Sequence, residues 1–437
     1  MVFKERQITF DKRSHQITNI NIWTPDSQWL VYDVRPNGTS FTGLTIEKIH
    51  VTDGNTEIIY QATDGAHVGV VTVSPQKPAR YAFIHGPEHP DDHWQYDFHH
   101  RRGVIVSDNQ LNVAANIDAL DITPPYTAGA LRGGTHVHVF SPDSSRLSFT
   151  YNDHVMHELN PALDLRNVAV AIPLKTVTSA KKHPREYDGS YFSVVVSCTT
   201  AHPTPGSDEI SRAYEEGWVG QQGYRKENGQ WQRWALAFIG DTYSANGEKI
   251  PEVYLVDLPA HDEDYAIESP QPLAGTETTL PAPPNGVKQQ RLTFTHQNRW
   301  PGVVTTPRHW LRVSPDGSKI CFLMKDNIGI VQLWYVSPNG GIPVQITHDN
   351  HDIQSAFSWD SKGHFIAFVC DNSLMLCDSH SGKIQRLTAR TEIAPCADAI
   401  VISPDDKYVA FMRDIGGYRQ IFIAETGITD FQLNAGK

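Results

Sequence analysis

Short apolar segments separated by tight-turn signals recur along the whole chain. Each unit has an apolar strand, a turn of the type Ser-Pro-Asp-Gly, a second apolar strand and, in several copies, a closing Leu-Thr. Proline fixes φ at the first central position of such a turn, and Asp and Gly tolerate the backbone angles of the next positions, so each turn predicts a hairpin. The clearest copies are VSPDGSKICFLM, FSPDSSRLSFTY and ISPDDKYVAFMR, with their prolines at positions 315, 142 and 404.

Weaker copies of the turn bring the number of units to seven. They lie at Pro25, Pro75, Tyr187 and Trp359. A repeat of about 45 residues with about four short strands per unit is typical of a β-propeller blade. The pattern therefore predicts an all-β fold, a seven-bladed β-propeller that uses residues 1–437 as a single domain.

The two ends of the chain and the longest interval between turns refine this prediction. The phrase RQITFDK at the amino terminus matches the strand that ends a unit, whereas the carboxyl end lacks an equally good copy. We therefore expect residues 6–10 to supply the outer strand of the last blade and close the ring. The interval from Tyr187 to Pro315 predicts a fourth blade with two insertions, residues 199–230 and 260–287, which serve as binding walls or as surface decoration.

Composition and charge exclude several classes of function. Hydrophobic residues make up 39%, and 49 acidic against 37 basic residues give a net charge of −12. This balance argues against broad binding to nucleic acid or to an anionic membrane. No apolar segment is long enough for a membrane span or an export signal, and the five cysteines include no Cys-x-x-Cys pair. We expect a soluble, cytoplasmic protein.

Histidines concentrate at two places that can carry chemistry. His136 and His138 share one face of a predicted inner strand, and His309 occupies the position equivalent to His136 in another blade. Such imidazoles bind metal or act in catalysis, or else they are hydrogen-bonded channel and core residues. The tract FIHGPEHPDDHWQYDFHHRRG adds further histidines and the pair Arg101 and Arg102, which suits metal or anion binding as well as a solvated polar loop.

Three short motifs, in order along the chain, carry a resemblance to a known family. YAFIHGPEH resembles Phe-Cys-His-Glu-Gly-Pro-His, GGTHVHVFSPD resembles Cys-Thr-His-Glu-Phe-Trp-Val-Pro-Asp, and HPREYDGS resembles His-Leu-Met-Ser-Asn-Tyr-Asp-Gly-Ser. With the repeated turns, the sequence resembles the TolB-type propellers and more specifically oligogalacturonate lyase, together with uncharacterised YidR-type proteins related to that enzyme. The resemblance implies a cytoplasmic, seven-bladed, manganese-dependent carbon–oxygen lyase that cleaves short uronides by β-elimination.

The same resemblance implies roles for individual residues. It makes His136 the catalytic base and Arg102 the catalytic arginine, with Arg101 one place away. It implies Mn²⁺ or another divalent cation held by His183 and by His309, the histidine that remains where the family has Gln-Val-Thr-His-Pro-His and this chain has VVTTPRHW. His85 and His138 are the expected substrate contacts.

The expected activity is β-elimination on a small anionic saccharide. A base removes the proton next to the carboxylate while cationic groups stabilise the enolate-like transition state. Two non-catalytic hypotheses stay open: a TolB-like propeller that mediates protein–protein interaction, and a scaffold that contacts a protein partner through the insertions of blade four.

Overall fold

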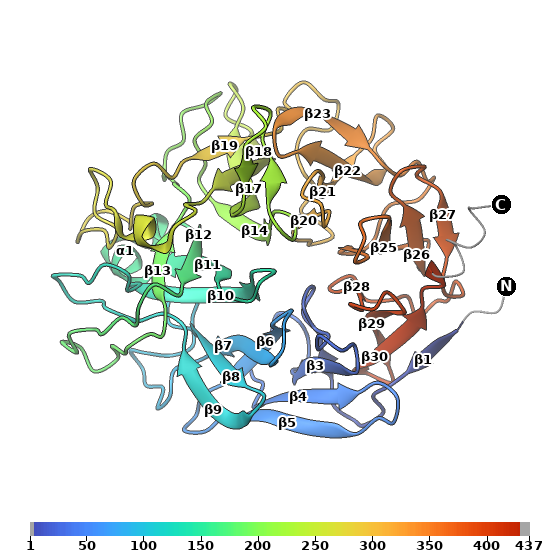
Figure 1. The fold of residues 1–437 in the computed structure, drawn as a ribbon, viewed down its shortest axis with the longest axis horizontal. Helices are drawn as coiled ribbons and strands as arrows, with labels where there is room; N and C mark the ends of the chain where they lie inside the picture. Colours follow the sequence, from blue (N-terminus) through green and yellow to red (C-terminus); the bar gives the residue numbers. More distant parts are fainter. Residues whose placement is uncertain (1–3, 429–437) are drawn as a thin grey trace.

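The chain folds into a ring of blades around a central axis. The computed structural model describes residues 4–428, and these form seven four-stranded antiparallel sheets (Figure 1). In each of the first six sheets the strands follow sequence order from the centre of the ring outward. This arrangement confirms the predicted all-β, seven-bladed propeller.

Each blade has four strands, ordered from the centre of the ring outward. Blade one contains β2 (His15–Gln16), β3 (Trp29–Val34), β4 (Thr45–His50) and β5 (Thr56–Gln61). Blade two contains β6 (Val68–Val73), β7 (Arg80–His85), β8 (Arg102–Ser107) and β9 (Gln110–Asn116). Blade three contains β10 (Gly133–Phe140), β11 (Leu147–Asp153), β12 (Asn167–Ile172) and β13 (Phe192–Val195). Blade four contains β14 (Ala213–Trp218), β17 (Ala235–Tyr243), β18 (Lys249–Asp257) and β19 (Gln289–Arg291). Blade five contains β20 (Arg312–Val313), β21 (Ile320–Lys325), β22 (Val331–Ser337) and β23 (Gly340–Gln345). Blade six contains β24 (Ser358–Trp359), β25 (Phe365–Cys370), β26 (Ser373–Asp378) and β27 (Ile384–Arg386). Blade seven contains β28 (Val401–Ile402), β29 (Tyr408–Ile415), β30 (Tyr418–Glu425) and β1 (Glu5–Gln7). A small hairpin, β15 (Tyr224–Arg225) and β16 (Trp231–Gln232), and three short helices, α1 (His154–Leu159), η1 (Pro161–Leu163) and η2 (Asp262–Ala266), complete the described elements.

The amino-terminal strand closes the ring, as predicted. β1 pairs antiparallel with β30, with Gln7 opposite Phe422. Just after β1, the Thr9 hydroxyl accepts a hydrogen bond of 2.8 Å from the Ile421 backbone N–H. The last blade is therefore built from both ends of the described chain, which leaves the ring without an open gap.

Blade four begins later in the sequence than the turn at Tyr187 suggests. The apolar run after that turn forms β13, whose Val195 pairs with Ala169 of β12, so it completes blade three. Residues 199–230 accordingly carry β14, the innermost strand of blade four, in addition to the β15 strand. Residues 260–287 connect β18 to β19 and contain η2. A fully buried outer strand has the same apolar pattern as an inner one, and this explains the difference.

The repeated Ser, Asp and Thr residues act as backbone anchors. In blade five the Ser314 hydroxyl donates to Asp316 at 2.5 Å and accepts from the Lys319 N–H at 3.0 Å, which fixes the turn. Thr347, at the end of the same blade, accepts a hydrogen bond of 2.9 Å from the Leu333 N–H. These contacts satisfy backbone groups where the strands end, so the repeat motif is structural.

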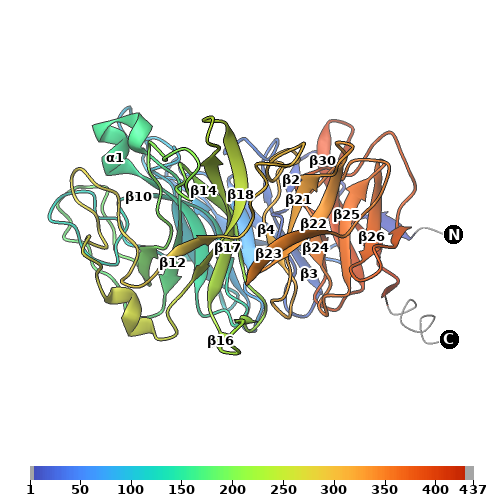
Figure 2. The ribbon, with the colours of Figure 1, turned by 90° about the horizontal axis from the view of Figure 1, so that it is seen from above.

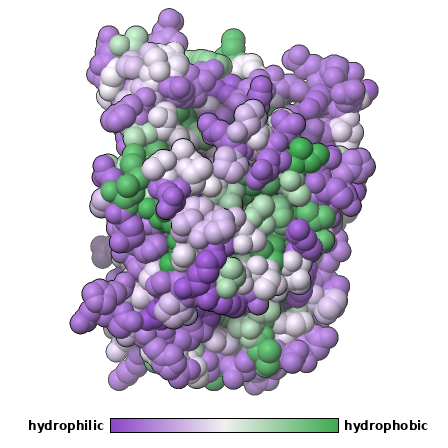
Figure 3. Space-filling view, turned by 90° about the vertical axis from the view of Figure 1, so that its left-hand side faces the viewer, coloured by the Kyte–Doolittle hydropathy of each residue, from purple (hydrophilic) through white to green (hydrophobic). Residues whose placement is uncertain are grey.

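Adjacent blades share apolar cores, and the two faces of the ring differ. Val170 of blade three and Leu236 of blade four, for example, belong to one buried cluster. α1 projects from one face, and the β16 hairpin lies on the opposite face (Figure 2). The outer side of the ring seen in Figure 3 is mostly hydrophilic, with small hydrophobic groups between polar residues. None of the described helices combines the length and the apolarity that a membrane crossing requires.

Candidate functional site

The innermost strands of blades two, three and four are distorted at equivalent places. Each has a β-bulge: between Gly69 and Thr72 in β6, between His136 and Val139 in β10, and between Tyr214 and Gly217 in β14. At each bulge one non-glycine residue takes a positive φ: Val70 at 61°, Val137 at 54° and Glu215 at 56°. Bulges redirect neighbouring side chains, and positive φ at a valine is a costly conformation that concentrates at functional sites. The distortion marks this part of the channel as the candidate site.

His136 stands beside the β10 bulge in a cationic environment. Its ring is half-buried, and the charges of Arg101, Arg166 and Arg308 act on it. Burial, and then repulsion by these guanidinium groups, hold the pKa of His136 well below its usual value. The imidazole is therefore neutral at neutral pH and can accept a proton.

Two of these arginines lack an acidic partner. Arg101 is only 3% exposed; it donates to the Tyr96 hydroxyl at 3.2 Å, and its Nε has no hydrogen-bond partner. Arg166 donates from Nε to the Asn152 amide oxygen at 3.2 Å, and burial lowers its pKa to about 9. Within residues 4–428 no carboxylate oxygen lies within 4.0 Å of the nitrogens of either guanidinium. Buried cations without a counter-ion are costly, which favours binding of an anion here.

Two further arginines extend the cationic surface toward blade five. Arg308 pairs with Glu215 at 2.8 Å, and the Arg212 guanidinium lies 4.5 Å from the centre of the Tyr214 ring. All four of these residues line a pocket of about 270 Å³ between blades four and five. Glu215 thus neutralises Arg308, one of the three arginines whose charges act on His136.

The segment that precedes β8 carries Arg101 and an exposed aromatic ring to this place. Phe98 is 57% exposed, and the guanidinium groups of Arg101 and Arg166 lie 5.0 and 5.9 Å from its ring centre. A Cβ at Gly134 would lie 2.1 Å from the Phe98 carbonyl oxygen, so the segment can pass directly over β10 only because residue 134 is glycine. An apolar ring face flanked by cations is suited to a charged sugar.

Arg102 and His85 belong to a different cluster, within blade two. Arg102 forms a two-pronged ion pair with Glu88 at 2.8 and 2.6 Å and lies over the Tyr187 ring. His85 contacts the Gly86 carbonyl oxygen at 2.6 Å and the Tyr60 hydroxyl at 3.0 Å, and burial, then Arg102, lowers its pKa to about 4. The structure thus places Arg101, rather than Arg102, among the groups that act on His136.

His138 is enclosed in the core. Its Nε2 lies 2.9 Å from the Thr135 hydroxyl, and burial lowers its pKa to about 3. A Cβ at Gly103 would lie 2.2 Å from the same nitrogen, so the packing around this ring is close. His138 is buried with no exposed surface, in contrast to the substrate contact that the resemblance implied.

The two expected metal ligands have separate surroundings. His309 uses both ring nitrogens for backbone contacts, Nδ1 with the Pro307 carbonyl oxygen and Nε2 with the Leu323 N–H, each at 3.2 Å. His183 accepts a hydrogen bond from the Arg185 N–H and lies beside Trp94. The His309 ring therefore has no free lone pair for a cation, and the expected site between these two residues does not fit a bound Mn²⁺.

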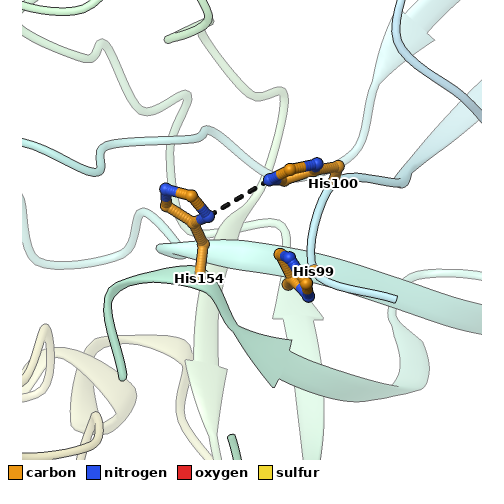
Figure 4. A group of neighbouring side chains, drawn as sticks. All are labelled: His99, His100 and His154. Atoms are coloured by element: carbon orange, nitrogen blue, oxygen red, sulfur yellow. Dashed lines mark hydrogen bonds between the residues drawn. The ribbon is translucent and has the colours of Figure 1, made fainter. Parts of the chain in front are cut away.

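Other histidines do form groups with metal-binding potential. Ligand atoms lie within 4.8 Å of one another in three groups: His99, His100 and His154; His99, His157 and Asp164; and Asp349, His351 and Cys370. Figure 4 shows the first group, in which His100 Nε2 and His154 Nδ1 are 3.1 Å apart. Neither His183 nor His309 belongs to any of these groups within the described chain.

Sequence reasoning missed Phe98, Arg166, Arg212 and Arg308. These residues lie in connections between strands of blades two to five, at no constant spacing. Only the folded ring gathers them at the candidate site. No single position in the repeat points to them, because Arg166 precedes the third strand of its blade whereas Arg212 and Arg308 precede innermost strands.

Comparison with known proteins identifies the family. The uncharacterized protein YidR of Escherichia coli (strain K12) is 57% identical over 421 residues, which covers 96% of this chain and 97% of that protein. The chain belongs to the YidR family. Residues 67–187 also match the family described as a protein of unknown function (DUF3748), and this region contains His136, Arg101 and the histidine groups of blades two and three.

Solved structures share the fold of this YidR-family chain at low sequence identity. An oligogalacturonate lyase in complex with manganese matches with a TM-score of 0.56 and 12% identity, covering 97% of this chain and 93% of that one. An oligogalacturonate lyase from Vibrio parahaemolyticus matches with a TM-score of 0.51 and 10% identity over the same shares of the two chains. These matches support the propeller architecture.

Proposed function

We propose that this protein is an oligogalacturonate-lyase-like enzyme that acts by β-elimination on a short uronide or a related anionic saccharide. One observation carries the proposal: a neutral imidazole, His136, lies among three arginines, of which Arg101 and Arg166 have no carboxylate partner. The fold likeness to oligogalacturonate lyase agrees with it but, at 12% identity, does not carry it.

In this reaction His136 removes the proton from the carbon that bears the uronate carboxylate. The electron pair of that C–H bond moves toward the carboxylate, and Arg101 and Arg166 stabilise the resulting dianion. The pair then forms a C=C bond while the bond to the glycosidic oxygen at the neighbouring carbon breaks, and the leaving oxygen takes up a proton from solvent water. Proton removal needs a neutral base and fixed positive charge beside the carboxylate, and His136 and the arginines suit these two roles.

Electrostatics also explain how His136 becomes a competent base only with substrate in place. In the free protein, burial and the nearby arginines keep its pKa low. A bound carboxylate offsets part of the arginine charge and so raises the pKa of the imidazole. Proton transfer to His136 is therefore easier in the complex than in the free enzyme.

The arginines take the role that a metal ion would otherwise fill at the carboxylate. Because His183 and His309 do not form a cation site together, no step of the proposed reaction passes through a metal. The Arg102–Glu88 pair and His85 stabilise the segment 86–101 and act as positioning residues, and His138 supports β10 from within the core.

The expected substrate is small and anionic, and we place its conversion in the cytoplasm. An overall charge of −12 repels anions at long range, so recognition depends on the local arginines. The five cysteines are free, as is usual in a reducing compartment.

The direct test follows product formation. Purified protein is incubated with digalacturonate and with unsaturated digalacturonate, with and without Mn²⁺, and formation of the unsaturated or 2-keto sugar products is measured by ultraviolet absorbance and mass spectrometry. We expect product with the wild-type protein, none with His136→Ala, and normal turnover with His351→Ala, a matched change at a histidine whose side chain is 57% exposed. Absence of product under all conditions would refute the enzyme proposal.

A second function is favoured by the opposite end of the channel. A cavity of about 940 Å³ opens among the repeated turns, lined in part by Pro25, Pro315, Trp218, Trp231 and Trp359. Such a surface suits a protein segment, as in a non-catalytic TolB-like propeller or a scaffold. This alternative predicts a stoichiometric partner that is released by Trp231→Ala and unaffected by His136→Ala.

A further inference from the structure

Three side chains that offer metal-binding atoms, His99, His157 and Asp164, meet on the α1 face of the ring. His99 belongs to the segment between β7 and β8, His157 to α1, and Asp164 to the turn before β12. Asp164 Oδ2 lies 3.7 Å from His99 Nδ1 and 3.5 Å from His157 Nδ1. The rings of His99 and His157 stack with their centres 3.9 Å apart, so both nitrogens approach the same carboxylate oxygen from one side.

Two of the three ligands, Asp164 and His99, are held so that one ligand atom of each has no hydrogen-bond partner. Asp164 Oδ1 accepts hydrogen bonds from the Asn152 amide and the Asp153 N–H, both at 3.0 Å, so Oδ2 faces the histidines. His99 is only 4% exposed, and its Nδ1 has no hydrogen-bond partner. A buried nitrogen without a partner is costly unless another group fills the space it faces.

We propose that His99, His157 and Asp164 bind one transition-metal dication of the kind that imidazole favours, such as Zn²⁺. Metal–ligand bonds of about 2.0–2.1 Å in a tetrahedral site put ligand atoms about 3.3 Å apart, so separations of 3.5 and 3.7 Å need only small closure. Hydrogen bonds that orient a ligating carboxylate are typical of built metal sites. The His157 side chain is 31% exposed, which gives the ion a path from solvent.

The other two groups suit a cation less well. His100 Nδ1 donates to the Gln95 carbonyl oxygen and His100 Nε2 shares a 3.1 Å hydrogen bond with His154 Nδ1, so both ring nitrogens of His100 are already used. In the third group, burial raises the pKa of Cys370 to about 12, so its thiol stays protonated. The carboxylate-containing triad is the one with free ligand atoms.

A bound ion would join two parts of the structure that carry the proposed active site. His99 lies between Phe98 and Arg101, and Asn152 contacts both Asp164 and Arg166. The ion therefore fixes the positions of the segments that carry Arg101 and Arg166, and it takes no part in the chemistry. This inference does not rest on the proposed function, because binding can be measured without any turnover.

Metal binding to the intact protein tests the proposal. Protein purified without a histidine tag is stripped with a chelator and titrated with ZnCl₂, with MgCl₂ as the comparison, by calorimetry and by elemental analysis after dialysis. We expect one Zn²⁺ per chain, an increase in melting temperature on binding, and at least tenfold weaker binding of Mg²⁺, which prefers oxygen ligands.

Variants decide which group binds the ion. His157→Ala and Asp164→Asn, which keeps the Oδ1 acceptor, are each expected to weaken Zn²⁺ binding at least tenfold, whereas His154→Ala and the control His351→Ala change it less than threefold. Equal circular dichroism spectra establish that the variants fold. The proposal is overturned if wild-type protein binds no Zn²⁺ stoichiometrically, or if His154→Ala abolishes binding while His157→Ala and Asp164→Asn do not.

Discussion

Blades two to four and blades five to seven are built from the same sequence repeat. They differ in the length and regularity of their innermost strands and in the connections between their strands. In blades five to seven the innermost strands are two residues long and the turns keep the Ser-Pro-Asp pattern closely or, in blade six, retain its aspartate. In blades two to four the innermost strands are six to eight residues long and bulged, and the long connection between β7 and β8 carries Phe98, His99 and Arg101 over β10. The regular blades follow the repeat closely, and the irregular ones carry most of the residues of the proposed active site.

The largest expected effect comes from the base in blade three. His136→Gln keeps a polar side chain of similar size but removes the imidazole, and we expect turnover of digalacturonate to fall by roughly 10²–10⁴-fold. The melting temperature should change little, because the wild-type ring is half-buried and neutral. Steady-state kinetics and thermal unfolding measure the two effects; unchanged turnover would remove His136 from the mechanism.

Removal of an arginine from the candidate site should lower activity and raise stability. Arg166→Met removes a half-buried charge that has no carboxylate partner but retains the apolar volume of the side chain. We expect kcat/KM for the uronide to fall by about tenfold or more, and the free energy of unfolding to rise, since a partly desolvated charge without a counter-ion is lost. A variant that is both less stable and fully active would show that Arg166 has a purely structural role.

The regular blades should show the opposite behaviour. Thr347→Val in blade five deletes the hydroxyl that accepts from the Leu333 N–H and donates to Gln332 at 2.6 Å. A buried donor left without a partner costs about 1–3 kcal/mol, so the free energy of unfolding should drop by that amount in denaturant titration. Turnover at low temperature should stay at the wild-type level, and a selective loss of activity would contradict the division between the two groups of blades.

An effect confined to the pH dependence of stability concerns a buried acid on β14. Burial raises the pKa of Glu216 to about 8, so the folded protein keeps this proton at neutral pH while the unfolded chain releases it near its usual value. Stability of the wild type should therefore fall, relative to Glu216→Gln, as the pH rises from about 5 to about 8, by up to about 1.4 kcal/mol per pH unit. Denaturant unfolding at several pH values measures this slope; parallel curves would place the Glu216 pKa in its ordinary range.

Most of the fold could be predicted from the sequence because the repeat encodes local structure. The turn prolines, the apolar strands on either side and the closing Leu-Thr each specify a hairpin or an anchor, as Ser314 and Thr347 illustrate. Strand β14 could not be placed, because the preceding blade ends in an apolar strand with the pattern of an inner one. Local patterns therefore reveal blades well but their boundaries poorly where connections are long.

The candidate site was only partly predictable. His136 stands out by its position before a turn, but Arg166 reaches it from a later connection of the same blade and Arg308 from the connection between blades four and five, and no spacing along the chain encodes that meeting. The chemically similar neighbours Arg101 and Arg102 point into different clusters because successive residues of an extended chain face opposite sides. His309 has the same place in its blade as His136, yet its nitrogens bond to the backbone.

The most direct test of the central claim, that His136 lies in a built anion site, is the titration of its ring by NMR. The signal is assigned by comparison with His136→Gln and followed over pH with and without galacturonate or digalacturonate. The account predicts a pKa below 6.5 in the free protein, because burial and the arginines disfavour the charged ring, and a higher pKa with the uronide bound. An ordinary pKa that the uronide leaves unchanged would contradict it.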